Sequence, residues 1–132
     1  MSGQPFWTFD RFEPGALVGE SELVLDREQI LRWKLLFPGE NEAEAAPPGL
    51  LIAMLMKGYM QAIASRPPGN VHAGQSLRWT GARVTEGARL KARFHCLDKE
   101  IRKERRWLHL SAELSAGGTP VLSGEMTMLW AA

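Results

Sequence analysis

An apolar helix pattern between two proline pairs constrains the fold of this 132-residue chain more than any other feature. Residues 47–69 read PPGLLIAMLMKGYMQAIASRPPG, and apolar side chains recur there at the i, i+3, i+4 spacing of a helix. Proline suits the first helical turn because its missing N–H would have no partner there, and Pro67-Pro68 predicts the end of the helix. A helix that is apolar almost all round is typically buried. We therefore expect a second layer of structure to cover it.

The sequence after Gly69 changes from helical to strand periodicity. It predicts strands at residues 71–82, 88–98, 105–115 and 120–130, with turns at Glu86-Gly87, at the charged residues 99–104 and at Ala116-Gly117-Gly118-Thr119. The apolar positions that should face inward are Leu90, Ala92, Phe94, Cys96, Leu108, Leu110, Ala112, Leu114, Leu122, Met126, Met128 and Trp130. Segregated helices and strands indicate an α+β fold in which an antiparallel sheet covers the long helix.

The segment before the apolar helix predicts one weak strand and one short helix. Residues 16–25 carry the strand pattern, and Asp26 with Gln29 three positions later has the arrangement of a capping box. The helix that begins there should end at Pro38-Gly39.

Composition limits the broad class of protein. The length suits a single domain, 1–132, with a core of its own. The formal net charge is +1, which gives no general attraction to nucleic acid or to an anionic membrane. The one cysteine, Cys96, excludes an intramolecular disulfide framework. No signal-peptide pattern opens the chain and no apolar run is long enough to span a bilayer, so we expect a soluble, cytoplasmic protein.

Three stretches carry a resemblance to a known family. FDRFEPGALVGESELVLDREQILRW is similar to the opening of MaoC-like dehydratases, and SGEMTMLW is similar to their last strand. FPG followed by PPGLLIAMLMKGYMQ resembles the signature of hydroxyacyl-carrier-protein dehydratases. The resemblance implies a hot-dog fold, in which a curved antiparallel sheet wraps around a central helix, and at least a homodimer whose sheets pair edge to edge. It also implies acyl thioesters of coenzyme A or acyl carrier protein as partners, as in fatty acid metabolism, with no other cofactor.

The catalytic dyads of these families are not matched. The MaoC-like pattern G-D-x-N-P-x-H, set with its first glycine on Gly39, places Glu40 on the aspartate and Ala45 on the histidine. The carrier-protein pattern needs a histidine before F-P-G and a glutamate on the central helix, where this chain has Leu36 and Met54. A dehydratase of the standard mechanism is therefore not indicated.

Two parts of the expected site remain available at the start of the long helix. Free amides at a helix start suit a carbonyl oxygen that gains negative charge, which favours the N–H groups of Gly49 and Leu50. A hot-dog thioesterase needs one carboxylate, and Glu40 is the best candidate, with Glu42 and Glu44 as weaker ones. The alternative interpretation is an acidic loop in water beside the positive end of a helix.

The resemblance extends to substrate contacts. It makes Met54 and Tyr59 candidates to line an acyl channel, although methionines can equally fill a core. Arg83, Arg89, Arg102 and Lys103 are candidates to contact coenzyme A phosphates or an acidic carrier protein, because arginine donors match phosphate. A charged hairpin turn that faces only water is the alternative for the last two.

Three functions therefore stay open. The chain is a divergent enoyl or 3-hydroxyacyl thioester hydratase-dehydratase, an acyl thioesterase that uses a loop glutamate, or a non-catalytic thioester binder or partner subunit. Whether it is an enzyme at all is left open by the sequence. One cysteine and the scattered His72, His95 and His109 do not form a metal-ligand set, so we expect no metal.

Overall fold

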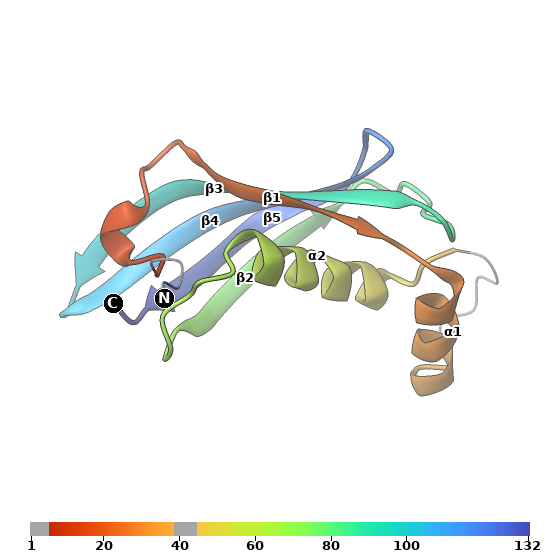
Figure 1. The fold of residues 1–132 in the computed structure, drawn as a ribbon, viewed down its shortest axis with the longest axis horizontal. Helices are drawn as coiled ribbons and strands as arrows, with labels where there is room; N and C mark the ends of the chain where they lie inside the picture. The colour runs from red at the N-terminus through yellow and green to blue at the C-terminus, as the bar shows by residue number, and fades with distance from the viewer. Residues whose placement is uncertain (1–5, 39–44) are drawn as a thin grey trace, which may run out of the picture.

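The computed structural model describes residues 6–38 and 45–132. Its elements are η1 (Phe9–Arg11), β1 (Leu17–Val24), α1 (Arg27–Leu36), α2 (Pro48–Ala62), β2 (Val71–Trp79), β3 (Arg89–Arg102), β4 (Arg105–Ala116) and β5 (Thr119–Trp130). The strands form one antiparallel sheet in the order β1-β3-β4-β5-β2, curved around α2 (Figure 1). The predicted α+β class is confirmed.

The inward faces of the three central strands form the core. Every position predicted to face inward on β3, β4 and β5 is buried, from Leu90 and Phe94 to Met128 and Trp130. This agreement follows from the period of two in the sequence, which assigns alternate side chains to opposite faces of a strand. α2 packs on the same face through six buried positions: Leu50, Leu51, Met54, Leu55, Gly58 and Tyr59.

The charged stretch 99–104 is mostly strand, and the expectation of a six-residue turn was wrong. β3 continues to Arg102 and pairs with Arg105 across a turn of two residues, Lys103 and Glu104. Both turn residues have positive φ angles, 53° and 64°, as two-residue hairpins require. Cross-strand pairing extended β3 through residues whose charges alone favoured a loop.

The apolar helix is buried on only one side. Met60 is 56% exposed and Ile52 and Met56 are half-buried, although helical periodicity predicted burial all round. The reason is that α2 packs against β1, β3 and β4 on one side, and no described layer covers the other. α2 thus keeps an open apolar face among the described residues.

Candidate functional site

The start of α2 is a helix end without a side-chain cap. Pro47 occupies the N-cap position with extended backbone, and Pro48 at the first helical position has no N–H to donate. The amides of Leu50 and Leu51 both donate to the Pro47 carbonyl, at 3.1 and 3.2 Å. The Gly49 amide alone among these has no hydrogen-bond acceptor in the described structure. Of the two predicted donors, Gly49 is therefore available and Leu50 is already engaged.

The indole ring of Trp33 covers Gly49. A Cβ placed on Gly49 would lie 2.5 Å from Cζ2 of Trp33, a distance too short for any side chain to occupy. The ring packs in turn against Phe37, with 4.6 Å between the ring centroids. The Nε1 atom of Trp33 is buried and meets no acceptor in the described structure. α1 thus brings a second unpaired donor to the start of α2.

A hollow of about 460 Å³ lies on another side of the helix start. Pro48 and Leu51 of α2 line it, together with Trp79 at the end of β2 and the following residues Arg83 and Val84. The amide of Ala46 donates to the Val84 carbonyl at 2.6 Å, so the chain before α2 is tied to the chain after β2. The hollow therefore combines aromatic and aliphatic walls with one guanidinium group beside the helix start.

The three candidate carboxylates, Glu40, Glu42 and Glu44, lie outside the described residues. The described structure ends before them at Pro38 and resumes after them at Ala45.

Met54 and Tyr59, the candidates for an acyl channel, are buried in the core. The Sδ atom of Met54 accepts a hydrogen bond of 3.5 Å from Nε2 of Gln29 in α1. The ring of Tyr59 meets Phe94 edge to face at 5.9 Å. Burial raises the pKa of Tyr59, and the nearby Arg66 opposes that shift. Neither side chain lines the hollow at the helix start.

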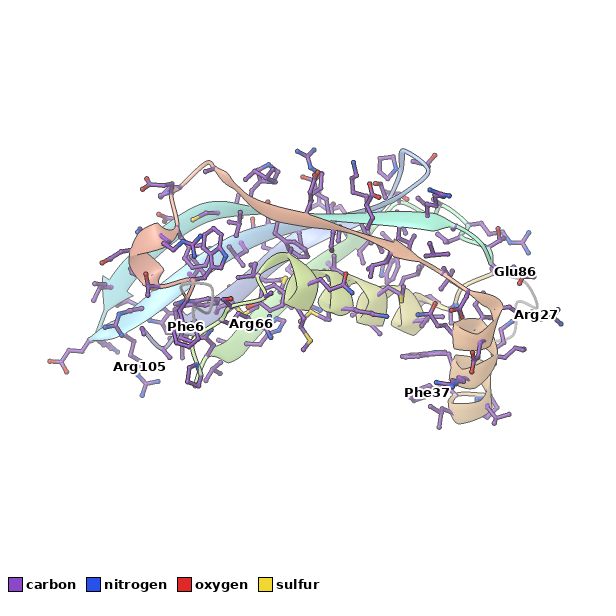
Figure 2. All side chains as sticks on the ribbon, viewed as in Figure 1. Phe6, Arg27, Phe37, Arg66, Glu86 and Arg105 are labelled. Atoms are coloured by element: carbon purple, nitrogen blue, oxygen red, sulfur yellow. The ribbon has the colours of Figure 1, made fainter. Side chains whose placement is uncertain are left out.

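The four candidate basic residues are distributed over three separate hollows. Arg83 lines the hollow beside α2, Arg89 lines one of about 500 Å³ with Glu22 and Lys91, and Arg102 and Lys103 line one of about 550 Å³ with Trp107. Arg89 and Arg102 stand at the two ends of β3, roughly 40 Å apart at the rise of an extended strand. Figure 2 shows Glu86, just before β3, and Arg105, just after it, at opposite ends of the molecule. One small ligand cannot contact all four in a single copy of the chain.

The three histidines lie away from the helix start. His95 and His109 are half-buried on β3 and β4, at positions that alternate with the buried ones, and Nδ1 of His109 is 3.4 Å from Oγ1 of Thr127. His72 lies near the beginning of β2, the strand whose other end carries Trp79. No group of three or more His, Cys, Asp or Glu side chains within residues 6–38 and 45–132 is arranged to hold a metal.

A hollow of about 690 Å³ lies against β2, β4 and β5 and is lined by Ser76, Ser111, Glu113, Ser123 and Glu125. Arg93 at its rim pairs with Glu20 at 3.1 Å. The unpaired buried donor of Trp33 and the unpaired Gly49 amide are at α2 instead, so the helix start is the better candidate site.

Comparison with solved structures identifies the fold. The MaoC-like dehydratase from Rhodospirillum rubrum matches with a TM-score of 0.79 and 14% identity, over 98% of this chain and 99% of that one. R-hydratase PhaJ1 from Pseudomonas aeruginosa matches with a TM-score of 0.77 and 17% identity, over 93% and 84%. The chain has the hot-dog fold.

A third structure extends the range of chemistry found on this hot-dog fold. The fluoroacetyl-CoA-specific thioesterase FlK matches with a TM-score of 0.65 and 17% identity, over 89% of each chain. No protein-family model and no curated protein sequence matches the chain. The hot-dog architecture predicted from the sequence is thus confirmed by structure, at identities that show the fold alone.

Sequence reasoning missed Trp33 and the walls of the hollow, Trp79 and Val84. Two residues in the sequence could have indicated the contact with Trp33. One is the glycine in the first turn of the apolar helix, which leaves room for a large neighbouring side chain. The other is the tryptophan on the preceding short helix. Which side chain fills that room depends on how the two helices of the hot-dog fold meet. In the part of the chain that the structure describes, no helix is long and apolar enough to cross a membrane.

Proposed function

We propose that this protein binds acyl thioesters of coenzyme A or acyl carrier protein at the start of α2. The observation that carries the proposal is the Gly49 amide, which has no acceptor among the described residues, at a helix start that also borders a hollow with apolar walls and Arg83. A thioester carbonyl needs a fixed N–H donor if negative charge is to develop on its oxygen. The amide of Leu50 is a weaker second candidate, because it must first leave the Pro47 carbonyl.

The reaction class we favour is hydration and dehydration of enoyl and 3-hydroxyacyl thioesters. In dehydration, a base removes the proton next to the carbonyl, and the electron pair moves toward the carbonyl oxygen, which Gly49 N–H stabilises. The pair then forms the carbon–carbon double bond while the hydroxyl group takes the proton that the base removed and leaves as water, which returns the base to its starting state. Solved hot-dog structures described as an R-hydratase and a MaoC-like dehydratase support this class.

Glu40 is our candidate for the base, with Glu42 and Glu44 as alternatives. All three precede the helix start in the sequence, by four to eight residues before Pro48. A single carboxylate also suffices for hydrolysis, in which it activates water or attacks the carbonyl itself. The thioesterase FlK has the same fold, which keeps hydrolysis as the second candidate function. A binder or partner subunit without catalysis is the third.

A panel of enoyl-coenzyme A and acyl-coenzyme A substrates separates these functions. Hydration that is lost in Glu40→Gln supports the hydratase, and release of free coenzyme A that is lost in the same variant supports the thioesterase. Saturable binding of a non-hydrolysable acyl thioester without turnover supports the binder. Absence of both binding and turnover overturns the proposal.

We also propose that the protein is a homodimer that pairs β2 with β2 of a second copy. β2 is an edge strand whose residues are mostly exposed on both faces, with the apolar Val71 and Trp79 half in water. An uncovered strand edge next to apolar surface favours pairing with another strand.

Light scattering tests the dimer. The expected mass is twice that of the 14.7 kDa chain. Met60→Glu on the open face of α2 should dissociate it, whereas Ile101→Glu, at a similarly exposed apolar position near the β3–β4 turn, should not. A monomeric wild type contradicts the proposal.

A further inference from the structure

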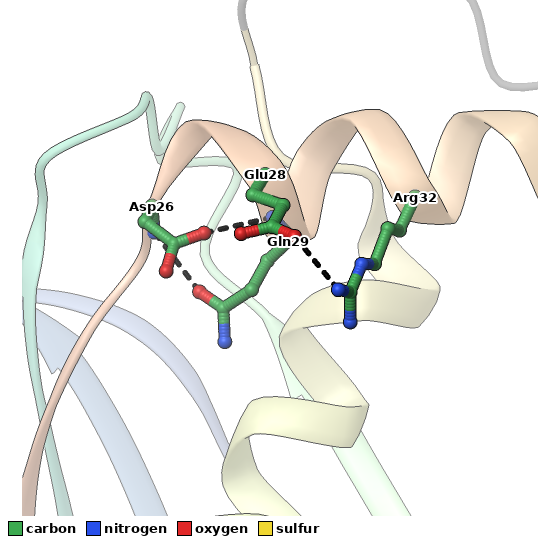
Figure 3. Close-up of polar contacts among 4 residues, drawn as sticks. All are labelled: Asp26, Glu28, Gln29 and Arg32. Atoms are coloured by element: carbon green, nitrogen blue, oxygen red, sulfur yellow. Dashed lines mark hydrogen bonds and ion pairs between the residues drawn. The ribbon is translucent and has the colours of Figure 1, made fainter.

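Trp33 is held over the start of α2 by contacts along the whole of α1. At the first turn, Asp26 and Gln29 form a reciprocal capping box (Figure 3). Nε2 of Gln29 also reaches Sδ of Met54 in α2. In the middle, Ile30 is buried in the core. At the last turn, Phe37 packs on the indole ring. The position of the ring is therefore fixed by the fold and is not a chance orientation of a surface side chain.

The N–H of this ring has no hydrogen-bond partner within residues 6–38 and 45–132. Nε1 has less than 1 Å² of accessible surface, and none of these residues places an acceptor within hydrogen-bonding distance. A buried donor without an acceptor destabilises a fold, so native structures rarely keep one without a role. Moreover, phenylalanine would supply the same aromatic packing without this donor.

Gly49 shows where the donor edge of the ring lies. Cε2, the ring carbon bonded to Nε1, is 3.4 Å from the position that a Gly49 Cβ would take, and Cζ2 is nearer still at 2.5 Å. Cη2 is also 3.4 Å away, so the ring meets the first turn of α2 at Cζ2, the corner beside the carbon that bears the N–H group. The glycine amide, the other unpaired donor, is on the same residue that the ring covers.

Among the described residues, two donors from two different elements thus lack an acceptor near the start of α2. Stabilisation of a developing oxyanion commonly uses two donors, and the helix start offers one free amide because Pro48 has none and Leu50 is engaged. Phe37 and Gly49 flank the ring without supplying any acceptor of their own.

We propose that Trp33 is a second hydrogen-bond donor to the thioester carbonyl oxygen, acting together with the Gly49 amide. This inference rests on the proposed thioester-binding function and adds a residue to its site. It assigns α1 the role of completing the site, since the capping box and the Gln29–Met54 contact position the indole. It also explains why glycine occupies position 49, because any side chain there would displace the ring.

Trp33→Phe tests the proposal, because it keeps an aromatic ring between Gly49 and Phe37 and removes only the N–H. The probe is a non-hydrolysable acyl-coenzyme A analogue with a ¹³C-labelled carbonyl group. We expect the variant to bind about fivefold to tenfold more weakly, as for loss of one hydrogen bond, with an unchanged melting temperature. We also expect the infrared carbonyl stretch of the bound analogue to rise toward its value in solution. Trp107→Phe, in a separate hollow, is the matched control and should change neither quantity.

A second measurement follows the indole itself. The chain has five tryptophans, and the indole signal that disappears from the ¹⁵N–¹H spectrum in Trp33→Phe identifies the one of interest. That signal should move downfield when the analogue binds to the wild type. Equal affinity and an equal carbonyl frequency in wild type and variant would overturn the role of Trp33 while leaving thioester binding intact. A wild type that binds no acyl thioester would instead overturn the proposed function, and the role of Trp33 with it.

Discussion

Gly58 of α2 lies directly against Ala92 of β3. A Cβ on Gly58 would be 2.7 Å from the Cβ of Ala92, and 2.9 Å from Oγ of Ser21 in β1. The Ser21 hydroxyl donates to the Gly58 carbonyl at 3.0 Å, so the point of closest approach also carries a helix-to-sheet hydrogen bond. This crossing sets how deeply the central helix sits in the sheet, and through that the position of the helix start about three turns away.

Gly58→Ala should therefore destabilise the protein. Helix propensity alone would favour alanine by about 1 kcal/mol, but the added methyl group must push α2 off the sheet, and overpacking costs typically 1–3 kcal/mol. We expect a net loss of about 1–2 kcal/mol in the free energy of unfolding, measured by urea denaturation. Gly74→Ala is the matched control, because its nearest neighbour would be 3.8 Å away. A variant as stable as the control would show that the helix can move away at no cost.

The capping box at the start of α1 gives a second prediction. The Gln29 amide donates to the Asp26 carboxylate at 2.8 Å, and the Asp26 amide donates to the Gln29 side chain at 2.9 Å (Figure 3). Asp26→Ala should lower the free energy of unfolding by about 1 kcal/mol, because the helix loses the carboxylate acceptor at its N-cap.

Glu28→Ala is the control for this helix. It breaks the ion pair between Glu28 and Arg32, whose side chains are 70% and 76% exposed, and such pairs contribute roughly 0.3–0.5 kcal/mol. Urea denaturation should therefore rank Asp26→Ala as the more destabilising of the two. The reverse order would show that the capping box is not the main constraint on α1.

The ionisation of Tyr59 gives a third prediction. Tyr59 is the one tyrosine in the sequence, so the ultraviolet titration of phenolate reports on it alone. Burial raises its pKa above the ordinary value of 10.0, and Arg66 offsets part of that rise. The phenol should therefore lose its proton above pH 10 in the native protein and near pH 10 in the protein unfolded by urea.

The same shift predicts how stability changes in alkali. Between the two pKa values the native state holds a proton that the unfolded state has lost, so stability must fall as pH rises through that range. Below the unfolded pKa both states are protonated and this contribution is constant. A phenol that titrates in the native protein at or below pH 10 would contradict the burial of this ring.

The parts of the fold that the sequence predicts well are those encoded within one element. The alternation at Leu90, Phe94 and Leu110 needs no knowledge of neighbouring strands, and each of these residues is buried as expected. The capping box of Asp26 and Gln29 is likewise local and is present. By contrast, the extension of β3 into its charged end depends on pairing with β4, which no single-strand pattern reveals.

The candidate site is less predictable because it is assembled from three elements. Proline and glycine at the start of α2 identified the helix end correctly. The indole of Trp33 arrives from α1, and Trp79 arrives from the end of β2, and their approach depends on packing between elements. The basic residues show the same limit, since charge in the sequence carries no information on which end of the sheet a residue occupies.

The distribution of these basic residues gives the last prediction. Arg83 lines the hollow at the start of α2, whereas Arg102 lies at the other end of the sheet. If the proposed site is correct, Arg83→Gln should weaken acyl-coenzyme A binding by roughly tenfold through loss of a charge-assisted contact to phosphate. Arg102→Gln should leave it within about twofold, because Arg102 lines a separate hollow beside the β3–β4 turn.

Two comparisons make this prediction specific to the phosphates of coenzyme A. Binding of the acyl-pantetheine thioester, which lacks the nucleotide, should be equal in wild type and Arg83→Gln. The salt dependence of acyl-coenzyme A binding should also be weaker in this variant, because screening acts on the charge that was removed. Equal losses in Arg83→Gln and Arg102→Gln would show that ligand reaches both ends of the sheet, which requires the second copy of the chain to contribute. A loss in Arg102→Gln alone would move the nucleotide site to the β3–β4 turn and away from the hollow that Arg83 lines at the start of α2.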